Sequence, residues 1–171
     1  MLQLGWWKME AVVAVYSDWG IGDGQTQPVT VRADRAHFRE ITDGAAVILG
    51  RKTMEDFPGG RPLKNRHNIV MTRSGGSIEG AETAGTVEEA LRLAKNYGRC
   101  VVIGGASVYS QLFPYIDRVY VTKLFCAPES CRFFQNLDED KNWQCIEAGP
   151  VLEEDGIGYS FCTYERINKG E

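Results

Sequence analysis

Four short runs of apolar residues recur along the chain, separated by segments with helical spacing. The runs cover residues 11–16 (AVVAVY), 45–50 (AAVILG), 67–72 (HNIVMT) and 100–105 (CVVIGG). Because they lack the alternation of a sheet with one solvated face, they are typical of strands buried on both sides. Helical patterns cover residues 29–42, 51–57, 86–94 and 106–113. Strands and helices that alternate in this way predict an α/β fold with a mostly parallel sheet.

The last third of the chain predicts antiparallel strands. Residues 117–125 (DRVYVTKLF) form a long strand-like run, and the runs 144–152 and 159–167 flank EEDGIG, which is typical of a hairpin turn. We therefore expect a single domain over residues 10–167, with an antiparallel C-terminal hairpin and helices on both faces of the sheet. Residues 1–9, which include Trp6 and Trp7, are expected to form an N-terminal extension, and residues 168–171 a C-terminal tail.

The composition argues against several classes of protein. The 171 residues are 43% hydrophobic without a run of about 18 apolar residues, as in one soluble domain with no membrane span. Five cysteines without a C-x-x-C pair, and only two histidines, argue against a metal site and a disulfide framework. We therefore expect a reducing, cytoplasmic setting. The net charge of −4 disfavours nucleic acid as a partner.

Positive charge gathers in the first half of the chain. Residues 32–73 carry nine Lys or Arg against five acids, whereas residues 129–171 carry four against ten. This distribution suits small polyanions such as phosphates or carboxylates, with a solvated charged face as an equal alternative.

Three of the predicted strand ends carry groups that suit anion binding. Gly104-Gly105 leads from a buried strand into a helix, Arg51-Lys52 follows a second strand, and Arg73 follows a third. Ligands of such sheets bind beyond the carboxyl ends of the strands, and glycine lets backbone N–H groups approach a phosphate. A tight strand-to-helix turn is the alternative for the glycine pair. Together the three ends favour a phosphate-rich ligand.

Asp34 raises a different question, because its predicted helix turns it toward an apolar face. Asp34, Phe38 and Ile41 stand at positions i, i+4 and i+7. One interpretation is a helix N-cap, where aspartate is favoured. The other is a carboxylate in an apolar pocket, where burial raises its pKa and suits it to pair with a nitrogen heterocycle.

Arg66 is the complementary candidate. Phe57, Pro62 and Leu63 form an apolar stretch before it, and its guanidinium could bind a carboxylate. A surface arginine is the alternative at this position.

Taken together, these segments resemble the dihydrofolate reductase family over residues 10–167. The resemblance is carried by AVVAVYSDWGIG, ADRAHFREIT, VILGRKTME, GRPLKNRHNIVMTR, VIGGASVYSQLFP and VYVTKL. It implies an eight-stranded sheet, the cofactor NADPH, and reduction of 7,8-dihydrofolate to tetrahydrofolate by a monomer. The chain differs from the family's usual pattern at Val29 in place of a tryptophan, Arg32 in place of a proline and Cys131 in place of an acid.

The resemblance also implies roles for individual residues. Asp34 and Thr122 would be catalytic, with Thr122 hydrogen-bonded to Asp34. The other substrate-binding residues would be Val13, Ala14, Phe38, Phe57, Leu63 and Arg66. The cofactor-binding residues would be Ala14, Ile21, Gly22, Arg51, Lys52, Thr53, Met71, Thr72, Arg73, Ile103, Gly104, Gly105, Ala106, Ser107, Val108 and Tyr109.

Two other functions remain as alternatives. A related reductase of flavin synthesis acts on a ribosylated pyrimidine, but that substrate carries a phosphate and no glutamate tail for Arg66 to bind. A non-catalytic protein that binds NADPH or folate is the second alternative.

Overall fold

The computed structural model describes residues 8–23 and 26–167, so the expected roles of Trp6-Trp7 and residues 168–171 lie outside the described residues. The strands are β1 (Met9–Val15), β2 (Ala46–Gly50), β3 (His67–Met71), β4 (Ala81–Ala84), β5 (Cys100–Gly104), β6 (Arg118–Leu124), β7 (Trp143–Ala148), β8 (Leu152–Glu154) and β9 (Ile157–Arg166). The helices are α1 (Arg32–Thr42), α2 (Arg51–Glu55), α3 (Val87–Ala94) and α4 (Ala106–Leu112), with short 3-10 turns at η2 (Pro58–Gly60) and η3 (Phe113–Tyr115).

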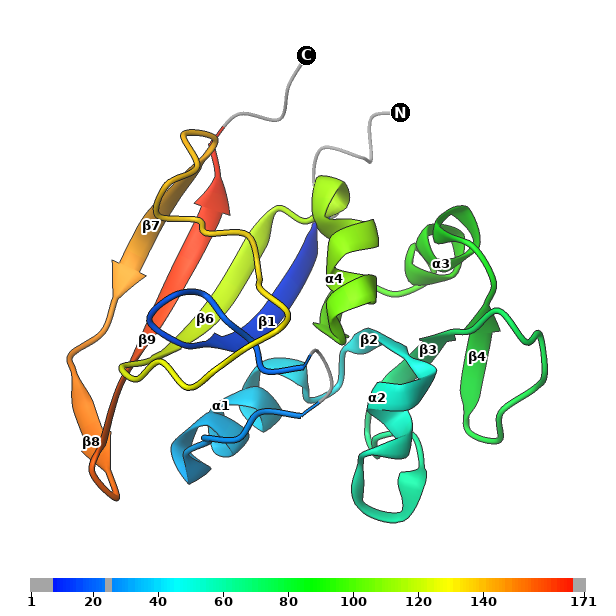
Figure 1. The fold of residues 1–171 in the computed structure, drawn as a ribbon. Helices are drawn as coiled ribbons and strands as arrows, with labels where there is room; N and C mark the ends of the chain where they lie inside the picture. The colour runs from blue at the N-terminus through cyan, green and yellow to red at the C-terminus, as the bar shows by residue number, and fades with distance from the viewer. Residues whose placement is uncertain (1–7, 24–25, 168–171) are drawn as a thin grey trace.

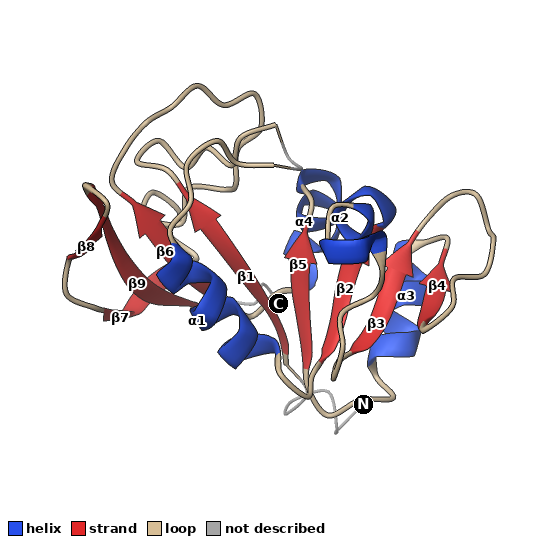
Figure 2. Cartoon of the chain, turned by 90° about the horizontal axis from the view of Figure 1, so that it is seen from below, coloured by secondary structure: helices blue, strands red, loops and turns tan. Residues whose placement is uncertain are grey.

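All of these strands join one sheet, in the order β4-β3-β2-β5-β1-β6-β9-β7, with β8 also paired to β9 (Figure 2). The pairings from β4 to β6 are parallel, and those of β9 with β6, β7 and β8 are antiparallel. The mostly parallel sheet with an antiparallel C-terminal part is therefore confirmed.

The expected number of eight strands is wrong, because the described residues form nine. β4 has only four residues, AETA, and three of them are half-buried, so no apolar run marks it. The run expected over residues 144–152 is two strands, because the chain leaves β9 after Ala148 and rejoins it at Leu152. Asp155 and Gly156 both have positive φ values in the turn from β8 to β9, as a two-residue hairpin turn requires.

Apolar side chains are buried on both faces of the sheet. Along β1, Ala11 and Val13 belong to the core cluster that includes α3 and α4, whereas Val12 belongs to the cluster beneath α1 and α2 (Figure 1). Successive side chains of a strand point to opposite faces, so a continuous apolar run is what a sheet covered on both sides requires. Helices on both faces are thus confirmed.

Two boundaries differ from the sequence-based expectation. Met9, which we assigned to the extension, is fully buried in β1 and pairs with Cys100. The α1 helix begins at Arg32 rather than at residue 29. In the part of the chain that the structure describes, no helix has the length and apolar character needed to cross a membrane.

The central strands β1 and β5 separate toward their carboxyl ends (Figure 2). Their pairing covers only Met9 to Ala11 of β1, although β1 continues to Val15 and β5 to Gly104. The carbonyl of Val12, beyond the last paired residue, instead accepts a hydrogen bond from the Tyr109 hydroxyl at 2.6 Å. The separation opens the sheet at the edge where α/β proteins bind ligands.

Candidate active site

Asp34 lies in the first turn of α1 and is not its cap. The N-cap residue is Val31, and no side chain of the cap residue bonds to the helix. The Asp34 carboxylate turns toward the sheet, where its Oδ1 accepts a hydrogen bond from Thr122 Oγ1 of β6 at 2.6 Å. Thr122 is fully buried. The structure therefore contains the hydrogen bond that the resemblance implied, and no side chain of the described residues donates to the other oxygen, Oδ2.

The pKa of Asp34 is raised from its ordinary value, chiefly because burial disfavours the charged form. The Thr122 hydrogen bond and the charges of His37 and Arg35 act in the opposite direction. His37, one helical turn further on, stacks on Phe161 with ring centroids 4.0 Å apart. Phe161 of β9 pairs directly with Thr122 of β6. These two adjacent residues of the sheet therefore contact two side chains of α1, Asp34 and His37.

Glu154 of β8 binds the first residues of α1. Its Oε2 accepts hydrogen bonds from the backbone N–H of Arg32 at 2.6 Å and from the Arg32 side chain, and its Oε1 accepts one from the N–H of Ala33 at 3.1 Å. A proline at position 32 would have no N–H to donate. Glu154 thus satisfies the helix terminus that Val31 leaves uncapped.

A small cavity lies between the separated ends of β1 and β5. Its volume is about 130 Å³, and Val13 and Ala14 line it from β1. The rest of its lining consists of Ile21, Gln27, Thr53, Ile103, Gly104, Gly105 and Tyr109. The pKa of Tyr109 is raised, mainly by burial and also by the charge of Asp34. The cavity brings together residues that we expected to bind cofactor from four separate segments.

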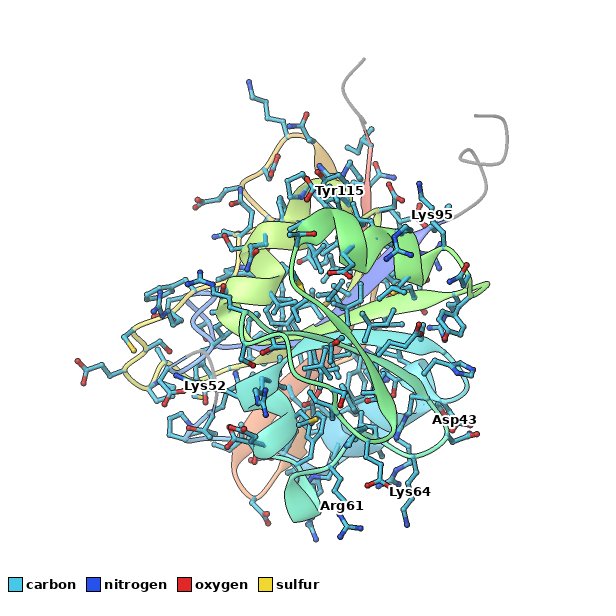
Figure 3. The ribbon with its side chains drawn as sticks, turned by 90° about the vertical axis from the view of Figure 1, so that its right-hand side faces the viewer. Asp43, Lys52, Arg61, Lys64, Lys95 and Tyr115 are labelled. Carbon is cyan, nitrogen blue, oxygen red and sulfur yellow. The ribbon has the colours of Figure 1, made fainter. Side chains whose placement is uncertain are left out.

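A larger cleft of about 760 Å³ continues outward from Gly105 and Thr53, which line both spaces. Ten of the residues that we expected to bind cofactor line this cleft: Arg51, Lys52, Thr53, Met71, Thr72, Arg73, Gly105, Ala106, Ser107 and Val108. Arg51 donates to Ser74 at 3.0 Å and pairs with Glu55. Within the described residues, no carboxylate pairs with Lys52 or Arg73, so both cations are available to an anionic ligand. Figure 3 shows Lys52 on the outer side of α2.

Arg66 immediately precedes β3, and its charged neighbours are Arg39 and Asp43 at the end of α1. Its Nη1 donates to the carbonyl of Lys64 at 2.9 Å, but its Nε is buried and lacks a hydrogen-bond partner among the described residues. Burial lowers the pKa of Arg66, which Asp43 opposes. A buried guanidinium nitrogen without a partner is unfavourable, and a ligand carboxylate would satisfy it.

The three apolar side chains expected around a pterin, Phe38, Phe57 and Leu63, are partly buried against the core cluster beneath α1 and α2. The loop that carries Ile21 and Gly22 is held by the segment after β6. Ile21 N–H donates to the Arg132 carbonyl, the Cys131 N–H donates to the Gly22 carbonyl, and Gly22 N–H donates to Ser130 Oγ at 3.1 Å.

Several residues of the two cavities were missed by reasoning from the sequence. The larger cleft also includes Gly50, Ser74, Ala84, Gly85 and Gln111, and the smaller one includes Gln27. Ser74 could have been found, since it follows Arg73 at the same strand end. Gly85 could not, because it follows the unrecognised strand β4. Gln27 lies in a loop that no periodic pattern describes.

Known proteins resemble this chain over most of its length. The family model described as dihydrofolate reductase matches residues 8–166. The chain is 38% identical to the dihydrofolate reductase of Bacillus subtilis, over 88% of this chain and 90% of the relative. It is 41% identical to that of Mycobacterium tuberculosis, over 85% of this chain and 90% of the relative.

A solved structure of dihydrofolate reductase from Enterococcus faecalis, complexed with NADP(H) and RAB-propyl, superimposes with a TM-score of 0.84 at 30% identity. The match covers 95% of this chain and 98% of that one. The comparisons lend no support to the pyrimidine reductase alternative. The chain belongs to the dihydrofolate reductase family.

Proposed function

We propose that this chain catalyses the NADPH-dependent reduction of 7,8-dihydrofolate to 5,6,7,8-tetrahydrofolate. The observation that carries the proposal is the partly buried carboxyl group of Asp34, with a raised pKa and one oxygen held by Thr122. Strand β1 lies between β5 and β6. Asp34 lies on the side of β6, and the cation-lined cleft opens on the side of β5. One face of the opened sheet edge thus suits a heterocycle, and the other suits a dinucleotide.

The residues of the cleft fit NADPH. Arg51, Lys52 and Arg73 offer three cations to its phosphates, including the 2′-phosphate dianion, and Lys52 and Arg73 pair with no described carboxylate. The backbone from Gly105 to Ser107 lines the same cleft and suits the pyrophosphate. Ala14, Ile21 and Tyr109 would surround the nicotinamide in the smaller cavity. When bound there, NADPH supplies a hydride to C6 of the pterin.

The substrate is held by the residues of α1 and of the segment from α2 to β3. The carboxylate of Asp34 accepts hydrogen bonds from N3–H and from the 2-amino group of the pterin, one to each oxygen, a planar arrangement that suits a carboxylate. Phe38, Phe57 and Leu63 contact the pterin and benzoyl rings. Arg66 binds the α-carboxylate of the glutamate tail, which satisfies its buried Nε.

The chemical contribution of the chain is positioning and proton supply. Asp34 is the source of the proton that reaches N5 of the pterin through a water molecule, and its raised pKa keeps more of it protonated near neutral pH. Thr122 fixes the orientation of the carboxyl group. Ile21, which is buried and lines the smaller cavity, would exclude bulk water from the reacting atoms.

The proposed functional unit is a monomer, with dihydrofolate and NADPH as its partners. The test is to follow NADPH absorbance after addition of dihydrofolate, with the ribosylated pyrimidine as the competing substrate. We expect oxidation of NADPH with dihydrofolate alone. Oxidation with the pyrimidine alone would show the flavin-pathway activity. A change in NADPH fluorescence without oxidation would show a binding protein.

A further inference from the structure

Gln27 makes a hydrogen bond inside the smaller cavity that the proposed reaction does not use. Its side-chain Nε2 donates to the backbone carbonyl of Ala14 at 2.8 Å, and both residues line the space between β1 and β5. Gln27 is half-buried, whereas its neighbours Thr26 and Pro28 are exposed. A side chain of the loop therefore reaches into the smaller cavity, which is the space assigned to the nicotinamide.

The acceptor of this hydrogen bond lies on an edge of β1 that the sheet leaves open. Carbonyls two residues apart in a strand point to the same side, so those of Val12 and Ala14 share one edge. Pairing of β1 with β5 ends at Ala11, and neither carbonyl meets a neighbouring strand on that side. Tyr109 satisfies the carbonyl of Val12, and Gln27 satisfies that of Ala14.

The two donors differ in how readily a ligand can replace them. Tyr109 belongs to α4 and is packed in the main core cluster, with ring contacts to Phe134. Gln27 belongs to the loop between β1 and α1, beside the exposed residues Thr26 and Pro28, and its carboxamide is the same chemical group as the carboxamide of nicotinamide. A ligand that carries a primary carboxamide can satisfy the Ala14 carbonyl equally well once Gln27 has left it.

We propose that Gln27 is an internal competitor of the cofactor: its side chain occupies the Ala14 carbonyl in the free protein, and the nicotinamide carboxamide must displace it. The inference rests on the proposed function. It makes Gln27 a residue that weakens binding of nicotinamide-bearing ligands alone. Ligands that fill only the cation-lined cleft do not reach Ala14 and are indifferent to Gln27.

The test compares dissociation constants of NADPH and of 2′,5′-ADP, which lacks the nicotinamide, for the wild type and Gln27→Met. Methionine keeps the length of the side chain and removes the donor. One hydrogen bond less to break should tighten NADPH binding by about 3- to 10-fold and leave 2′,5′-ADP binding unchanged. Gln27→Asn, polar but too short to reach Ala14, should behave like Gln27→Met. Gln144→Met, at an exposed glutamine of β7, is the matched control and should leave both constants unchanged.

Unchanged or weaker NADPH binding in Gln27→Met, measured by calorimetry on a variant with wild-type thermal stability, would overturn the inference. An equal change for both ligands would overturn it as well. These outcomes leave the proposed function standing. A wild-type protein that binds 2′,5′-ADP and NADPH equally, and oxidises no NADPH with dihydrofolate, would instead refute the proposed function and the inference with it.

Discussion

At Asp34, burial and hydrogen bonding act in opposite directions on one carboxyl group. Burial raises its pKa, and the Thr122 hydroxyl together with His37 and Arg35 lowers it, with burial as the larger effect. The native state consequently binds a proton at this group more tightly than the unfolded chain does. The same property that suits Asp34 to supply a proton makes its charged form unfavourable for folding.

Asp34→Asn should therefore stabilise the protein at neutral pH while lowering its activity. The destabilisation by the charged carboxylate is absent below the unfolded pKa of 3.8 and grows as the pH rises toward the raised native value. Asparagine avoids it, and its Oδ1 can still accept from Thr122. Thermal unfolding from pH 4 to pH 8 measures the effect. A variant less stable than the wild type at pH 8 would contradict the assignment of burial as the dominant cause.

Arg66→Ala should raise the KM for dihydrofolate by about 10-fold or more, because hydrogen bonds to charged groups contribute about 1.5–3 kcal/mol. Its effect on NADPH affinity should be small. Arg61→Ala is the matched control, since Arg61 lies in the same segment between α2 and β3 and is exposed (Figure 3). A loss confined to NADPH binding would show that the substrate pocket lies elsewhere.

Among the elements, α1 depends on a strand that is distant in the sequence. Glu154 of β8 accepts the backbone N–H groups of Arg32 and Ala33, and these hydrogen bonds lower its pKa. A carboxylate at this terminus also complements the helix dipole. The position of Asp34 thus depends on a contact between residues 122 positions apart.

Glu154→Gln should lower the midpoint of thermal unfolding and slow hydride transfer, since it removes the charge from the start of α1. The contribution of Glu154 is present above its unfolded pKa of 4.5 and is lost as the pH falls through its lowered native pKa. The difference from the wild type should therefore disappear in acid. Glu153→Gln, the exposed neighbour on β8, is the control. Equal unfolding midpoints of both variants at neutral pH would rule out a special role for Glu154.

The elements that reasoning from the sequence recovers are those with a local signal. Continuous apolar runs predicted β1, β2, β3 and β5, because strands buried on both faces need them. The rule that ligands bind beyond the carboxyl ends of parallel strands predicted the cations of the larger cleft, Arg51, Lys52 and Arg73. β4 has no such run, and Glu154 and Gln27 act through contacts distant in the sequence. For Asp34, the segment alone favoured a cap over a pocket acid, because aspartate is common at helix starts, yet the structure has Val31 as the N-cap.

For the whole molecule, positively charged side chains lie at the edge where the sheet opens between β1 and β5. Three cations of the first half, Arg51, Lys52 and Arg73, line the cleft beside β5, whereas Glu147, Glu153, Glu154 and Glu165 of the last third belong to the antiparallel strands. Lys52→Ala should weaken NADPH binding about 2- to 5-fold at low salt, as exposed charges do, and less at high salt. Lys95→Ala, at an exposed lysine away from the cleft, should have no effect (Figure 3). Equal effects of both variants would indicate that NADPH binding responds to the overall charge of the protein and not to Lys52 in particular.

The most direct measurement is the pH dependence of hydride transfer in a single turnover, with the NADPH-bound wild type and Asp34→Asn each mixed with dihydrofolate. We expect the wild-type rate to fall as the pH rises above the raised pKa of Asp34. The variant should be slower by about 10²–10⁴-fold and lose this dependence, because the general acid is gone. A variant that keeps the wild-type rate and pH profile would show that Asp34 does not supply the proton.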